Sequence, residues 1–146
     1  MTIHVENRQR TVAVNLPWLR RFAAAALEKC APLSADRCYA LMQLNEVEVA
    51  IVSDRVIARV HRDFMGLPGA TDVITFAHGE IVMSAQTARL YARDYGHSTD
   101  HELALYTIHG LLHLNGYKDA DTRDAARMQA AQDRVLRACL KAVPLP

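Results

Sequence analysis

No apolar stretch of this sequence is long enough to cross a lipid bilayer, because charged residues interrupt each one before the roughly 20 residues that a spanning helix needs. The N-terminal segment MTIHVENRQR also lacks the uninterrupted apolar core of a secretory signal. We therefore expect a cytoplasmic protein that does not use a membrane as a partner.

Cysteine is scarce, and neither sign of charge dominates. Cys30, Cys38 and Cys139 are odd in number and form no C-x-x-C pair, which favours reduced thiols over a disulfide framework. The 17 basic and 16 acidic residues leave a net charge of +1, so any affinity for nucleic acid must come from a local patch.

The sequence also lacks internal repeats and linkers rich in glycine or serine, so its 146 residues, 51% of them hydrophobic, predict one domain, 1–146. An extended start is followed by a helix capped by Asn15, and residues 38–52 are typical of a strand or hairpin arm. Helices are expected after Ser53 and after Ser84, and the runs VITFAH and EIVMS between them predict two antiparallel strands.

A further helix is expected from Thr99, which has the spacing of a capping box with Glu102. The apolar residues that follow cover nearly every face of this helix, which is typical of burial at the centre of a domain. They are Leu103, Leu105, Tyr106, Ile108, Leu111, Leu112 and Leu114.

Two histidines interrupt this apolar helix. His109 and His113 are four residues apart, so their imidazoles project from one face and can reach one cation. Gly116 can adopt the left-handed conformation that reverses the chain, and Asp119 follows where it can fold back toward the same cation. The pattern H-x-x-x-H-x-x-G-x-x-D therefore predicts a metal site formed by His109, His113 and Asp119.

The alternative is that both histidines are core residues satisfied by hydrogen bonds. Two imidazoles on one apolar face double the cost of burial unless a shared ligand offsets it, which favours the metal. Three protein ligands leave a tetrahedral position open for water, as in catalytic zinc sites, and water acidified there could act in hydrolysis. In zinc peptidases of the H-E-x-x-H type the residue after the first histidine is a glutamate base, but here it is Gly110.

The segment HGLLHLNGY, preceded by TDVITF and GEIVMS, resembles the YbeY endoribonucleases, and the likeness extends from about Ser53 to Met128. The resemblance implies an α+β fold with a small mixed β-sheet packed by several helices, and a metal site on a central helix and the loop after it. It also implies one Zn²⁺ per chain and a single-strand-specific endoribonuclease. Its substrate would be ribosomal RNA, in maturation and in ribosome quality control, with the small ribosomal subunit as partner.

Two positions differ from the pattern that is usual in that family. Asp119 stands where the family usually has a third histidine, and its carboxylate widens the choice of metal toward harder cations such as manganese. Met65 stands where the family commonly has an arginine. If that arginine contacts the scissile phosphate, this chain must supply positive charge from elsewhere or be a poor nuclease.

A basic stripe on the helix after Ser53 is one such source. Arg55, Arg59 and Arg62 form it, and it lies opposite three apolar residues, Val56, Val60 and Phe64. The stripe could bind an RNA backbone, or it could be the solvated face of an amphipathic helix. Asp72 follows a loop that contains proline and glycine, and we expect it to form a local turn and not to be catalytic.

Two other functions stay open. A metallopeptidase could use the same metal with another carboxylate, such as Glu80, as its base. Alternatively, the metal could be structural in a non-catalytic, ribosome-associated protein that binds RNA. The sequence does not identify the general base or the oligomeric state.

Overall fold

The computed structural model describes residues 1–35 and 41–146, so Cys38 and the first residues of the expected strand at 38–52 lie outside the described residues. The strands are β1 (Thr2–Asn7), β2 (Glu46–Val52), β3 (Val73–Phe76) and β4 (Glu80–Ser84). The helices are α1 (Leu16–Cys30), α2 (Asp54–Met65), α3 (Ala85–Tyr95), α4 (Thr99–Leu114) and α5 (Thr122–Ala142). A short 3-10 turn at Leu41–Gln43 precedes β2, which is why the expected strand begins only at Glu46.

The strands form one mixed sheet in the order β1-β2-β4-β3. β1 and β4 both pair in parallel with β2, whereas β3 pairs antiparallel with β4. The expected antiparallel pair is confirmed, and so is the α+β class with a small mixed sheet. β3 lies at one edge of the sheet, so one side of its backbone has no neighbouring strand among the described residues.

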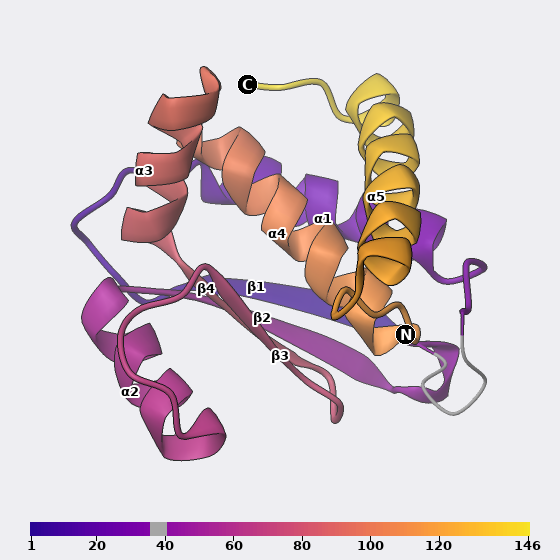
Figure 1. The fold of residues 1–146 in the computed structure, drawn as a ribbon. Coiled ribbons are helices and arrows are strands. Elements are labelled where there is room, and N and C mark those ends of the chain that lie inside the picture. Colours follow the sequence, from indigo (N-terminus) through magenta and orange to yellow (C-terminus); the bar gives the residue numbers. More distant parts are fainter. Residues whose placement is uncertain (36–40) are drawn as a thin grey trace.

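Helices cover the two faces of the sheet unequally (Figure 1). α1, α4 and α5 lie over one face, where Val49, Ile51 and Ile81 belong to the larger of two apolar clusters. α2 lies over the other face, where Ile57 and Ala50 belong to a smaller cluster. The larger cluster therefore contains the central helix α4, as its all-round apolar pattern predicted.

α4 approaches the sheet closely because Gly110 has no side chain. A Cβ atom at this position would lie 2.7 Å from Cδ1 of Ile81, and the other side-chain atoms of Ile81 would be almost as near. The position after His109 therefore faces β4. Any larger residue there would have to displace the side chain of Ile81 or shift the helix.

Side-chain caps fix where the helices begin. Asn15, Ser53 and Ser84 accept hydrogen bonds from backbone N–H groups in the first turns of α1, α2 and α3, as expected. The expected cap of α4 at Thr99 is wrong by one residue. Ser98 has an extended backbone and its hydroxyl accepts a hydrogen bond from the N–H of His101, so Thr99 is already helical.

α2 buries a narrower side than its apolar pattern suggested. Ile57 is fully buried, whereas Val56 is 38% exposed and Phe64 is 72% exposed. The reason is that α2 packs on the sheet through a narrow stripe formed by Ile57 and Val60. Phe64 instead contacts the ring of Phe76 edge-on, with 5.5 Å between the ring centroids.

The two cysteines that the structure describes, Cys30 and Cys139, are buried free thiols. Burial raises the pKa of Cys30 to about 12, so this thiol is unreactive at neutral pH. No helix in the described part of the chain is both long and apolar enough to cross a membrane.

Candidate metal centre

His109 and His113 project from one face of α4 toward Asp119. Their Nε2 atoms lie 3.0 Å apart. Oδ2 of Asp119 lies 3.4 Å from Nε2 of His109 and 3.5 Å from Nε2 of His113. The structure therefore brings together the three residues that the sequence pattern singled out.

A buried asparagine fixes the start of the loop that carries Asp119. The side-chain amide of Asn115 donates to the carbonyl of Cys30 at 2.8 Å, and its Oδ1 accepts from the N–H of Leu41 at 2.7 Å. Gly116 follows with a φ of 93°, in the left-handed region that favours glycine. The chain therefore leaves α4 in a defined direction before it reaches Asp119.

The second nitrogen of each histidine ring is held by an oxygen acceptor. Nδ1 of His109 donates to Oε1 of Gln132 at 2.8 Å, and Nδ1 of His113 donates to the carbonyl of Tyr117 at 2.9 Å. A neutral imidazole has one N–H group, so these bonds leave Nε2 unprotonated on each ring. Histidine binds metals in this state, with the other nitrogen oriented by such a partner.

The three converging atoms fit a cation. Two nitrogen lone pairs and a carboxylate oxygen repel one another at these distances unless a positive charge lies between them. Ligand atoms in a tetrahedral zinc site are about 3.3 Å apart, and the distances here are 3.0, 3.4 and 3.5 Å. Burial, and then the neighbouring His109, lower the pKa of His113, which keeps the ring neutral at neutral pH. The group could therefore hold a divalent metal ion.

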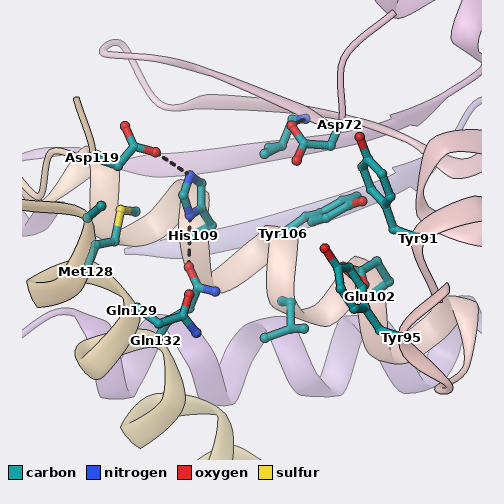
Figure 2. Close-up of a pocket in the computed structure, with 13 residues that line it drawn as sticks. Asp72, Tyr91, Tyr95, Glu102, Tyr106, His109, Asp119, Met128, Gln129 and Gln132 are labelled. Atoms are coloured by element: carbon teal, nitrogen blue, oxygen red, sulfur yellow. Dashed lines mark hydrogen bonds and ion pairs between the residues drawn. The ribbon is translucent and has the colours of Figure 1, made fainter. Parts of the chain in front are cut away.

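Two cavities meet at this group. The first, of about 500 Å³, extends from His109 and Asp119 to the tyrosines of α3 and α4 (Figure 2). The second, of about 550 Å³, is lined by both histidines, Asp119, Met65 and residues of β3. An extended ligand could thus lie in both cavities and pass the metal group between them.

The basic stripe is not part of either cavity. Arg55, Arg59 and Arg62 are exposed on α2, and none of them is among the described residues that line the two cavities. Binding of RNA by this stripe therefore stays a prediction. Met65, at the end of α2, does line the second cavity, so the position where the family commonly has arginine lies beside the histidines.

The two other carboxylates considered from sequence lie in different places. Glu80 alternates along β4 with Ile81, which packs against α4, so Glu80 is on the opposite face of the sheet. It lies 3.5 Å from His78 there and cannot act at the metal group. Asp72 accepts a hydrogen bond from the N–H of Val73 at 2.7 Å, the expected local contact, and also lines both cavities.

Sequence reasoning missed the residues around the three candidate ligands. Gln132 comes from α5. The only sequence feature that points to it is its place next to the apolar positions of that helix, which are Met128, Ala131 and Val135. Tyr106 was predicted only as a core residue, yet it lines the first cavity. Neither contact follows from spacing, because each depends on how α5 and α3 pack against α4.

Comparison with known proteins identifies the family. A family model described as endoribonuclease YbeY matches residues 4–139. The endoribonuclease YbeY of Lacticaseibacillus paracasei is 33% identical over 115 residues, which are 67% of this chain and 76% of that protein. That of Heliobacterium modesticaldum is 29% identical over 114 residues, 64% of this chain and 69% of that protein.

A solved structure supports the fold. The solution structure of TM1509 from Thermotoga maritima matches with a TM-score of 0.66 and 22% identity, covering 96% of this chain and 90% of that one. The match of the family model over most of the sequence, together with the identity to the Lacticaseibacillus paracasei protein, shows that the chain belongs to the endoribonuclease YbeY family.

Proposed function

We propose that the protein is a metal-dependent, single-strand-specific endoribonuclease. Its substrate is ribosomal RNA, which it cleaves in the cytoplasm on the small ribosomal subunit, in maturation and quality control. The observation that carries the proposal is the convergence of His109, His113 and Asp119 on one point, with both Nδ1 atoms already hydrogen-bonded. Membership of a family whose curated relatives are named endoribonucleases supports RNA as the substrate.

The shape of the site supports a single strand. The metal group lies between two cavities, and His109 and Asp119 line both, so a flexible strand could follow one cavity, pass the metal and leave by the other. Unpaired RNA can be bent and splayed in this way, whereas a duplex presents its backbone on a stiff, wide helix. The protein should therefore leave paired RNA uncut.

Each residue of the site then has a defined part. A divalent cation held there would act as a Lewis acid and lower the pKa of bound water. His109 and His113 would bind it as neutral donors, and Asp119 would add a negative charge that suits zinc, manganese or a similar ion. Gln132 and the carbonyl of Tyr117 keep the two rings oriented.

The peptidase alternative loses its one candidate base and gains none at position 110. Position 110, the place of the glutamate in H-E-x-x-H peptidases, faces Ile81 in the core. Glu80 lies on the far face of the sheet. In the other alternative the metal is structural and the protein is not a catalyst. That protein would bind metal but cleave no RNA, so a cleavage assay distinguishes it from the proposal.

A cleavage assay tests the proposal. Labelled single-stranded RNA and the matching duplex are incubated with the protein, with added chelator, and after zinc or manganese is restored. We expect cleavage of the single strand only, loss with chelator, recovery with metal and loss in His113→Ala. The control is His78→Ala, since His78 is exposed and lies outside both cavities. Cleavage by His113→Ala at the wild-type rate would contradict the proposal.

A further inference from the structure

The first cavity has a polar, aromatic end away from the metal group. Tyr91 and Tyr95 of α3 are 40% and 72% exposed there, and Glu102 and Tyr106 of α4 are each only 6% exposed. Figure 2 shows these four residues together at the opposite end from Asp119. The metal-dependent step uses none of them.

Tyr106 has a hydroxyl group without a partner. The hydroxyl is buried and makes no hydrogen bond with any described residue, although the ring lines the cavity. Buried hydroxyl groups are normally paired, so an unpaired one that borders a cavity indicates a missing ligand group. Burial, and then Glu102, raise the pKa of Tyr106, so its O–H remains a donor at all physiological pH values.

Glu102 supplies an acceptor beside this donor. Its Oε2 accepts a hydrogen bond from Nε2 of His97 at 2.7 Å, which fixes the carboxylate. Its other oxygen has no hydrogen-bond partner within the described part of the chain. A carboxylate held in this way is ready to accept N–H groups from a ligand in the cavity.

The charge of the cavity excludes phosphate at this end. Asp72 and Glu102 supply two carboxylates at this end, and no lysine or arginine is among the described residues that line the cavity. A phosphate group would be repelled, and a neutral ring that carries N–H donors would be favoured. The exposed rings of Tyr91 and Tyr95 offer flat surfaces on which such a ring can stack.

We propose that this end of the cavity is a nucleobase subsite that selects guanine. Guanine presents two kinds of N–H donor, N1–H and the N2 amino group, next to the acceptor O6. Glu102 accepts from the two donors and the hydroxyl of Tyr106 donates to O6, while Tyr91 or Tyr95 stacks on the ring. Uracil has a single N–H, and adenine and cytosine carry an amino group beside a ring nitrogen that accepts, so each matches fewer of these groups.

The inference rests on the proposed function, because the base belongs to an RNA strand whose backbone passes the metal group. It is tested by binding alone, so that it can fail separately. Metal-free protein is titrated with guanosine, inosine and adenosine while backbone and tyrosine signals are followed by NMR. Inosine is the matched probe because it lacks only the N2 amino group of guanosine.

We expect guanosine to shift signals of Tyr91, Glu102 and Tyr106, and to bind about tenfold tighter than inosine. Glu102→Gln should abolish this difference, whereas the matched control Asp94→Asn, on α3 outside the cavity, should keep it. Tyr106→Phe should weaken guanosine binding and leave the midpoint of thermal unfolding unchanged or higher, since it removes an unpaired buried hydroxyl.

Equal binding of guanosine and inosine by the wild-type protein, or shifts confined to other residues, would overturn the inference. Guanosine binding without any RNA cleavage would overturn the proposed function and leave the subsite standing. RNA cleavage without a preference for guanosine over inosine would overturn the subsite and leave the proposed function standing.

Discussion

Gln132 accepts a hydrogen bond from Nδ1 of His109 at 2.8 Å, and it comes from a different helix, 23 residues further along the chain. The bond fixes which nitrogen of His109 is protonated and so aims the lone pair of Nε2 at the candidate metal position. The histidine pair on α4 is thus completed by α5, which also follows directly after the loop that carries Asp119.

Replacing Gln132 by leucine should lower metal affinity about 10- to 100-fold, because outer hydrogen-bond partners contribute that much to metal binding. The measurement is a competition titration against a coloured chelator. Gln129→Leu is the matched control, since Gln129 lines the same cavity but donates to Asp133 instead. Equal affinities of the two variants would show that Gln132 does not orient a ligand.

Asp119→Ala should weaken metal binding by more than about 100-fold, since a lost ligand costs more than a lost outer partner. Asp119→His should keep zinc but bind manganese less well than the wild type, because imidazole favours zinc and carboxylate favours harder ions. Affinities for both metals should be measured on each variant. If Asp119→Ala bound zinc as tightly as the wild type, Asp119 would not be a ligand.

Gly110→Ala should destabilise the fold, because its Cβ would lie 2.7 Å from Ile81. Overpacking of this kind lowers the free energy of unfolding by about 1–3 kcal/mol, and the better helix propensity of alanine offsets about 1 kcal/mol of this loss. The free energy of unfolding in urea should therefore fall by up to about 2 kcal/mol. Shortening the neighbour with Ile81→Val should reduce the loss, whereas strictly additive effects of the two changes would argue against the contact.

Met65→Arg should raise the efficiency of RNA cleavage, because position 65 lines the cavity beside His109 and His113. A positive group near the scissile phosphate stabilises developing charge, and we expect kcat/KM to rise at least about tenfold. Binding should also become more sensitive to salt. Met65→Leu is the control that keeps the volume without the charge, and an equal rate for both variants would place the site of cleavage elsewhere.

The sequence predicted what depends on local geometry. The spacing of His109 and His113 places both rings on one face of any helix, and the turn at Gly116 directs the chain toward Asp119. The side-chain caps of α1, α2 and α3 were likewise predicted, and the cap of α4 was wrong by one residue at Ser98. The antiparallel strands β3 and β4 followed from two short apolar runs separated by Gly79.

The rest depends on tertiary packing that no local pattern contains. Val56 and Ile57 are both apolar, and only the position of α2 on the sheet decides that Ile57 is buried. The same position keeps Arg55, Arg59 and Arg62 away from the two cavities. Likewise, Tyr106 is a core residue by its pattern, and its unpaired hydroxyl is evident only once α3 has packed beside α4.

The metal content of the untagged protein, purified without chelator, tests the central claim most directly, since a histidine tag would itself bind metal. Elemental analysis should find about one zinc or similar divalent ion per chain, and much less in Asp119→Ala and His113→Ala prepared in the same way. Absence of metal from the folded wild-type protein, even after incubation with zinc or manganese, would contradict the claim and leave the converging lone pairs of His109 and His113 without a common ligand.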